Sequence, residues 1–283
     1  MATDPAAAVA ASLAEARLLW APRFEVIPVS GIENGLTALP AGTTVTVTAS
    51  PRHGMERTLE VSGELAARGF RVVPHLAARM IAGPDQLAHL VEGLAAADIH
   101  EAFVVGGDAS PPAGEYRDAG DLLDALRSLP HTLTRIGVGG YPEGHPLIAP
   151  ASLLQALRRK QPGADYLVTQ LCFDPSALVA WIRSIREDGI KLPVVVGMPG
   201  AVERRKLAEI SLKTGAGASL RYLTRHGRQI ATIARSRRYD PTPLARAVAA
   251  HLDDADLRIE GVHLFTFNQV EATQAWARRA AAA

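Results

Sequence analysis

The sequence has 283 residues, of which 48% are hydrophobic. This length allows one large domain or two small ones, and the composition excludes a chain that is disordered throughout. The 30 basic and 29 acidic residues leave a net charge of +1, which argues against a protein that coats nucleic acid. The single cysteine, Cys172, excludes a disulfide framework and a multi-cysteine metal site, and it fits the reducing environment of the cytoplasm.

Residues 1–22 are interpreted as an alanine-rich helical extension that precedes a catalytic domain over residues 23–283. The extension carries Asp4, Glu15 and Arg17 and lacks the basic start and unbroken apolar core of a signal peptide. No stretch of the sequence reaches the roughly 18 apolar residues that a membrane span needs. We therefore expect no association with a membrane.

Strand and helix patterns alternate along the rest of the chain. Strand starts recur roughly 30 residues apart over most of it, as βαβ units require. The expected strands are 24–29, 43–48, 71–75, 101–105, 135–140, 165–170, 192–197 and 262–267. Helical periodicity covers 55–69, 84–99, 119–129, 149–160 and 175–189, and we place extra helices at 201–213, 217–235 and 242–254.

Eight such units predict a single (β/α)8 TIM barrel with an N-terminal helix and extra helices between strands 7 and 8. The alternative is a doubly wound open sheet, but the first strand is not followed by the GxGxxG motif of its dinucleotide-binding forms. In a barrel, the carboxyl ends of all strands meet at one face, where active sites lie.

Glu25 lies inside the otherwise apolar first predicted strand, and further polar residues gather at the ends of the later ones. These are Thr48, His75, Asp108, Tyr141, Glu143, His145, Gln170, Thr266 and Asn268. Each has an ordinary interpretation: Glu25 as a surface residue, Asp108 as a turn residue, His75 as a core histidine. Their joint placement favours an active site, and a carboxylate between Phe24 and Val26 is costly to bury without a role.

Short motifs mark the same positions. In chain order they are FEVIP, VTAS with HGMERT, PHLAAR, GGD, GYPEGHP, LRRKQPGADYLVTQLCFD and HLFTFNQ. They resemble the motifs of the methylenetetrahydrofolate reductase family, which are FEFFPP, VTYG with GERDRT, PHLTC, RGD, AYPEGHP, LKxKVDAGADFIITQxFFD and HFYTLNR. The resemblance is collinear from about Phe24 to Asn268, and GYPEGHP is its most specific match. The family has a (β/α)8 barrel.

The resemblance implies reduction of 5,10-methylenetetrahydrofolate to 5-methyltetrahydrofolate by NADH or NADPH, usually through bound FAD, in one-carbon metabolism and methionine synthesis. Glu25 is then the general acid that protonates the leaving nitrogen, and Asp108 stabilises the cationic iminium. We expect apolar neighbours to keep the Glu25 carboxyl protonated near neutral pH. The substrate-binding candidates are Gln170, Leu207, Thr266 and Gln269, and the cofactor-binding candidates are Thr48, His75, Tyr141, His145 and Lys160.

The departures from the family pattern fall mainly on the flavin side. Gly106 stands at the arginine of RGD, and Ala49 at the tyrosine of VTYG. Leu207 replaces an aromatic residue, and Gln269 the final arginine of the last motif. This pattern is similar to a divergent, flavin-independent actinobacterial branch of the family. It favours direct hydride transfer from NADH to the folate without tightly bound FAD, and it implies no metal.

Other functions remain as alternatives. A metal-dependent barrel hydrolase would use His75, Asp108, Glu143 and His145 as ligands, but no HxH motif follows the first strand. A Schiff-base aldolase needs a lysine at the carboxyl end of a strand, whereas Lys191 precedes one. A third alternative is a non-catalytic folate- or nucleotide-binding barrel. The sequence makes no prediction of the oligomeric state.

Overall fold

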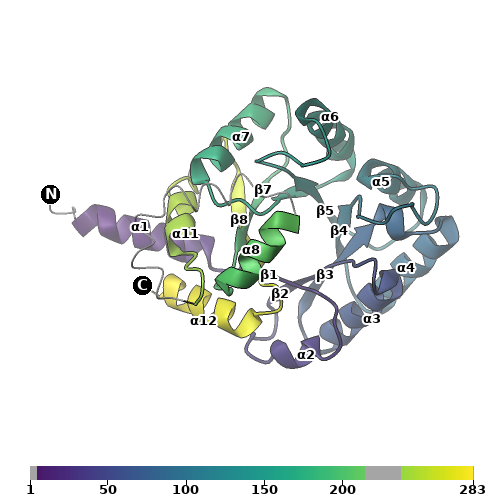
Figure 1. Cartoon of the computed structure of the whole chain (residues 1–283), viewed down its shortest axis with the longest axis horizontal. Coiled ribbons are helices and arrows are strands. Elements are labelled where there is room, and N and C mark those ends of the chain that lie inside the picture. The colour runs from purple at the N-terminus through teal and green to yellow at the C-terminus, as the bar shows by residue number, and fades with distance from the viewer. Residues whose placement is uncertain (1–4, 214–236, 283) are drawn as a thin grey trace.

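The computed structural model describes residues 5–213 and 237–282. Eight parallel strands form a closed barrel in chain order, and β8 pairs with β1 to complete it. The predicted (β/α)8 barrel is thereby confirmed (Figure 1). The strands are β1 Arg23–Val26, β2 Thr44–Val47, β3 Arg71–Ala77, β4 Glu101–Val105, β5 Arg135–Gly140, β6 Tyr166–Thr169, β7 Val194–Pro199 and β8 Ile259–Phe265.

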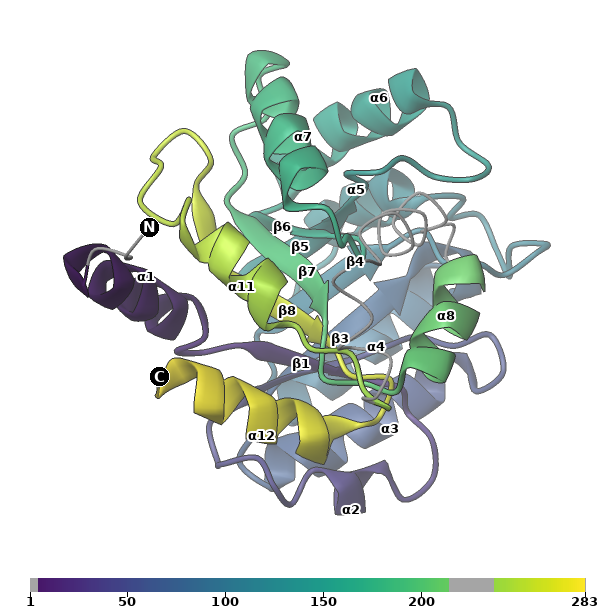
Figure 2. The ribbon, with the colours of Figure 1, turned by 60° about the vertical axis from the view of Figure 1, so that its left-hand side comes forward.

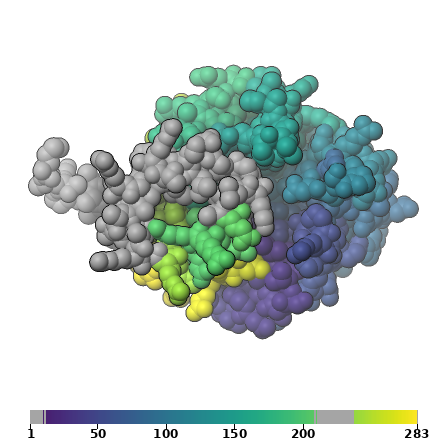
Figure 3. Space-filling model, viewed as in Figure 1, coloured from purple at the N-terminus to yellow at the C-terminus, as the bar shows by residue number. Residues whose placement is uncertain are grey.

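Helices surround the barrel. They are α1 Pro5–Leu18, α2 Ile32–Gly35, α3 Gly54–Ala67, α4 Pro84–Ala96, α5 Ala119–Ser128, α6 Pro150–Lys160, α7 Pro175–Glu187, α8 Arg204–Lys213, α11 Thr242–Ala249 and α12 Val270–Ala281, with short 3₁₀ turns η1 Ala78–Met80 and η2 Gln161–Gly163. The space-filling view shows side chains packed around the same ring in chain order, from purple and blue through teal to green and yellow (Figure 3).

Helix α4 shows how a helix packs on the barrel through one apolar face. In α4 the buried residues Leu87, Leu90, Val91 and Leu94 recur at helical spacing. Burial of each such side chain stabilises the fold by about 1.5–3 kcal/mol. Helices α5 and α7 begin where the carboxylates of Asp118 and Asp174 accept hydrogen bonds from backbone N–H groups of the first turn. Local sequence therefore sets where these helices start.

The inside of the barrel changes character along its axis. At its amino end, Arg23 donates to Glu101 at 2.6 Å and to the Tyr166 hydroxyl at 3.0 Å. Above this ion pair lies an apolar layer of Val73, Phe103, Tyr166, Val168 and Val195. These side chains fill the interior, so the barrel is not a pore. In the carboxyl halves of β3 and β8, Nε2 of His75 and Nδ1 of His263 are buried without a hydrogen-bond partner.

The N-terminal helix α1 lies outside the barrel, against α11 and α12 (Figure 2). Glu15 is buried there and accepts from Arg246 at 2.8 Å. The helix expected at 201–213 is present as α8. The one expected at 242–254 is shorter, because α11 ends at Ala249 and is followed by turns. The helix expected at 217–235 lies outside the described residues.

Candidate active site

Glu25 occupies the inner surface of β1 near its carboxyl end. Its neighbours Phe24 and Val26 are buried in the main core, whereas the Glu25 side chain is 13% exposed. The Glu25 carboxylate lies near two imidazoles. Nε2 of His263, on β8, lies 3.0 Å from Oε2 of Glu25, and Nε2 of His75, on β3, lies 3.8 Å from the same oxygen. Strand alternation turns Phe24 and Val26 to the opposite face of β1, so these two residues do not surround the carboxyl.

The two histidines differ in their access to the barrel mouth. The His263 side chain is 2% exposed and its Nδ1 is buried with no hydrogen-bond partner. The His75 side chain is 10% exposed, and of its two ring nitrogens only Nε2 is buried. Burial lowers the pKa of His75 to about 4, against a smaller opposing effect of Glu25. His75 is therefore neutral at physiological pH.

The loop after β8 fixes the position of Glu25. The Thr266 hydroxyl donates to the backbone carbonyl of Glu25. The Asn268 side chain accepts from the N–H of Ile27 at 2.8 Å and donates to its carbonyl at 3.1 Å. Thr266 is fully buried, so it holds the β1 backbone and does not face the mouth. Phe267 and Asn268 both have positive φ, at 48° and 65°, a conformation that is costly for phenylalanine and marks a constrained loop.

Asp108 is exposed on the loop that follows β4. Gly107 has φ 81°, and a Cβ there would lie 3.0 Å from the Cβ of Ala77, so the tight turn before Asp108 requires glycine. The carboxylate of Asp108 lies near Tyr141, after β5. Burial chiefly raises the pKa of Tyr141, and the charge of Asp108 adds to this effect. The structure thus associates a catalytic candidate with a cofactor candidate.

The other cofactor candidates have separate surroundings. His145 packs edge-on against the Tyr141 ring, and its Nδ1 accepts from the N–H of Leu147. Lys160 is buried at the end of α6, where its ammonium donates to the Gly139 carbonyl at 2.6 Å, and burial lowers its pKa to about 8. Thr48 continues β2 through a hydrogen bond from its N–H to Val26. The Lys160 ammonium is therefore bonded to the backbone of β5 in the protein interior.

The remaining substrate candidates follow β6, β7 and β8. Oε1 of Gln170 accepts from the N–H of Leu171, which leaves its NH₂ group to donate elsewhere. Leu207 is buried in an apolar cluster with Leu171, Phe173 and Val202. Gln269 accepts from the N–H of Glu203 and from Arg238, so it joins the loop after β7 to the loop before α11. Leu207 and Gln269 thus have structural contacts of their own.

His263 is the residue that the sequence analysis missed. It lies inside the motif HLFTFNQ, but only residues near the end of that strand were considered. Its contact with Glu25 spans 238 positions of sequence. A polar residue inside an apolar strand, the signal that singled out Glu25, would also have found His263.

Within residues 5–213 and 237–282, no three or more His, Cys, Asp or Glu side chains form a group that could hold a metal ion. None of the helices described there is long and apolar enough to cross a membrane.

Comparison with known sequences identifies the family. The sequence model described as methylenetetrahydrofolate reductase matches residues 30–280. The chain belongs to the methylenetetrahydrofolate reductase family. The match begins after β1, which ends at Val26, and extends past β8 into α12.

The individual family members compared below match less than half of the length of this chain. It is 33% identical over 138 residues to the "Probable methylenetetrahydrofolate reductase (NADPH)" of Caenorhabditis elegans, 31% over 134 residues to "Methylenetetrahydrofolate reductase (NADH) 1" of Arabidopsis thaliana, and 29% over 133 residues to the 5,10-methylenetetrahydrofolate reductase of Escherichia coli. These matches cover 45%, 40% and 46% of this chain, but only 20%, 22% and 44% of the relatives' own lengths.

Among solved structures, a putative deoxyribose-phosphate aldolase from Toxoplasma gondii ME49 is similar over 97% of this chain and 98% of its own, with a TM-score of 0.52 and 12% identity. At that identity the likeness concerns the fold alone.

Proposed function

We propose that this chain reduces 5,10-methylenetetrahydrofolate to 5-methyltetrahydrofolate with NADH or NADPH. Family membership supports the reaction class, and relatives named for NADH and for NADPH support a nicotinamide as hydride donor. The observation that carries the proposal is Glu25, a carboxyl at the carboxyl end of a barrel strand with one oxygen held by His263. Its other oxygen, Oε1, accepts no hydrogen bond from the described residues and is not buried.

The reaction needs one proton and one hydride. The methylene bridge opens as Glu25 protonates the leaving nitrogen, which gives a cationic iminium. Hydride from the dihydronicotinamide then reduces the iminium carbon to a methyl group, leaving the oxidised nicotinamide. Asp108, as an anion at the mouth, stabilises the cation, and the free NH₂ group of Gln170 donates to the folate. A proton from solvent restores Glu25 after each turnover.

We further propose that hydride passes directly from nicotinamide to folate, without tightly bound FAD. Gly106 stands where the resemblance implies an arginine that contacts flavin. The ammonium of Lys160, a cofactor candidate, is already bonded to the Gly139 carbonyl. These residues fit a tightly held flavin poorly. The reaction would take place in the cytoplasm, where it supplies methyl groups for methionine synthesis.

The activity is tested anaerobically with purified protein, NADH or NADPH and methylenetetrahydrofolate. We expect colourless protein to form 5-methyltetrahydrofolate at a rate that added FAD does not change. Strict dependence on added FAD would overturn direct transfer while leaving the reductase assignment intact. Absence of product under both conditions would overturn the reductase assignment itself.

The role of Glu25 is tested by Glu25→Gln, which keeps the shape of the side chain and removes the acid. We expect folding and folate binding to persist and kcat to fall by roughly 10²–10⁴-fold, the usual contribution of a general acid. Circular dichroism and folate binding serve as controls for the fold. A variant with kcat within about twofold of wild type would remove Glu25 from the mechanism.

A further inference from the structure

We propose that His263 is a positioning residue: by donating to Oε2 of Glu25, it keeps the transferable proton of that carboxyl on Oε1, the oxygen open to the barrel mouth. This inference rests on the proposed function, because it concerns the acid of that reaction. It assigns a role to a side chain that the sequence analysis did not single out.

The contact is short and shielded from solvent. His263 Nε2 lies 3.0 Å from Glu25 Oε2, within hydrogen-bond distance. The two side chains are 2% and 13% exposed. The His263 ring also packs edge-on against Phe265, with ring centroids 4.8 Å apart, which restricts its orientation. The hydrogen bond therefore joins two groups that are themselves held in place.

The surroundings of Nδ1 indicate which nitrogen carries the hydrogen. Nδ1 of His263 is buried without a partner. If the ring hydrogen were on Nδ1, it would be a buried donor with no acceptor. In that tautomer Nε2 has no hydrogen, so it could not donate to the Glu25 carboxylate that remains after proton transfer. A hydrogen on Nε2 makes a charge-assisted bond to that carboxylate and leaves only an unused lone pair at Nδ1. The geometry thus favours the Nε2–H tautomer.

The other groups around the Glu25 carboxyl do not replace His263. His75 Nε2, from β3, is 3.8 Å from the same oxygen, which is too far for a hydrogen bond. Thr46, paired in register with Glu25 on β2, has a buried hydroxyl with no partner. Among the described residues, His263 alone bonds the carboxyl. With Oε2 occupied as an acceptor, the acidic proton resides on Oε1, toward the substrate.

Two amide variants separate positioning from packing. In His263→Gln the amide nitrogen reaches approximately the position of Nε2, whereas in His263→Asn it lies near that of Nδ1 and leaves Oε2 without a donor. Both variants are neutral and polar, so each serves as the other's control for folding. We expect the Gln variant to keep kcat within about tenfold of wild type and the Asn variant to lose on the order of 10²-fold. KM for methylenetetrahydrofolate changes little in both, because His263 is buried away from the mouth.

Equal kcat values in the two variants, or an Asn variant with the kcat of the wild-type protein, would overturn the positioning role of His263. The proposed function would still stand in that case, because the wild-type protein is active. An inactive wild-type protein would instead overturn the proposed function.

Nitrogen-15 NMR of ring-labelled histidine in the substrate-free wild-type protein tests the hydrogen bond without any assay. The His263→Gln spectrum assigns the resonance. We expect a protonated Nε2 and a bare Nδ1 at neutral pH; a protonated Nδ1 would overturn the inference even in an active enzyme.

Discussion

Glu25 and His263 differ in how far the sequence reveals them. Glu25 stands out because an ionisable residue between Phe24 and Val26 conflicts with an otherwise apolar strand. The sequence does not reveal His263 in the same way, because its approach to Glu25 depends on β8 closing against β1, with Arg23 opposite His263 and Glu25 opposite Phe265. Local pattern thus predicts the acid, whereas its hydrogen-bond partner follows only from the closed register of the barrel.

Because of His75, we expect the stability of the folded state to depend on pH in the acid range. The pKa of its ring falls from an ordinary 6.5 to about 4 on burial, so the unfolded chain binds a proton that the folded chain excludes between these values. The folded state is therefore undiminished above pH 6.5 and loses stability as pH falls toward 4, by up to about 3 kcal/mol. Urea unfolding at pH 7 and pH 4.5 measures this loss.

The variant His75→Gln cannot titrate, so its unfolding free energy should fall less than that of wild type over the same interval. The same variant at pH 7 to 8 serves as the control, since no difference in slope is expected there. Parallel losses in both proteins from pH 7 to 4.5 would show that the His75 ring is protonated in the fold.

At the scale of elements, the sequence predicts the bounds of a strand well where its backbone groups bond only to neighbouring strands of the barrel. The predicted strands 101–105 and 135–140 coincide with β4 and β5. The predicted first strand, 24–29, extends beyond Val26, where β1 ends. The reason is tertiary: the Asn268 side chain, from the loop after β8, bonds both backbone groups of Ile27 in place of a strand. No local sequence pattern shows that a side chain takes the place of a neighbouring strand at Ile27.

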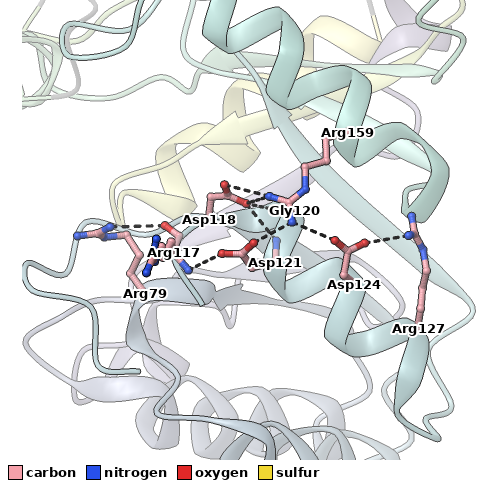
Figure 4. Close-up of polar contacts among 8 residues, drawn as sticks. All are labelled: Arg79, Arg117, Asp118, Gly120, Asp121, Asp124, Arg127 and Arg159. Carbon is pink, nitrogen blue, oxygen red and sulfur yellow. Dashed lines mark hydrogen bonds and ion pairs between the residues drawn. The ribbon is translucent and has the colours of Figure 1, made fainter. Parts of the chain in front are cut away.

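The loop that carries Asp108 depends on Arg79 of η1. The backbone N–H of Arg79 donates to the carbonyl of Gly106, and its guanidinium donates to the carbonyl of Ala109 at 2.7 Å. The guanidinium also contacts the carbonyl of Arg117 (Figure 4). Arg79→Met removes these side-chain donors. Because catalysis is sensitive to small displacements of an electrostatic group, we expect kcat/KM to fall on the order of tenfold. Steady-state assays check this.

Arg159→Met is the matched control for Arg79. Arg159 pairs with Asp118, Asp121 and Asp124 at the start of α5 (Figure 4). Arg159 is exposed, so the loss of each pair should cost about 0–1 kcal/mol of stability, and kcat/KM should stay unchanged. If both variants lost activity equally, the effect would belong to the charge balance of this surface and not to the anchoring of the Asp108 loop.

At the scale of the whole molecule, the two ends of the barrel differ in how their polar groups are hydrogen-bonded. At the amino end a cluster of polar groups pairs within itself: Arg23 bonds Glu101 and the Tyr166 hydroxyl, and the guanidinium groups of Arg23 and Arg135 each lie 4.6 Å from the centroid of the Tyr166 ring. Toward the carboxyl end, some buried polar atoms have no hydrogen-bond partner, namely Nε2 of His75 and Nδ1 of His263. Groups left unpaired in this way favour function over stability at the carboxyl end.

This division predicts that Tyr166→Phe changes stability without changing catalysis. The Phe ring keeps its contacts with both guanidinium groups but deprives the buried Arg23 of a hydrogen-bond acceptor. Loss of such a bond costs about 1–3 kcal/mol, measured as a lower urea midpoint. We expect kcat and KM to stay within about twofold of wild type, because the substitution lies at the end opposite Glu25. Tyr141→Phe, at the mouth, is the matched control and should show the reverse: a lower kcat/KM with little change in the urea midpoint. A Tyr166→Phe enzyme that keeps its stability but loses activity would contradict the separation of the two ends.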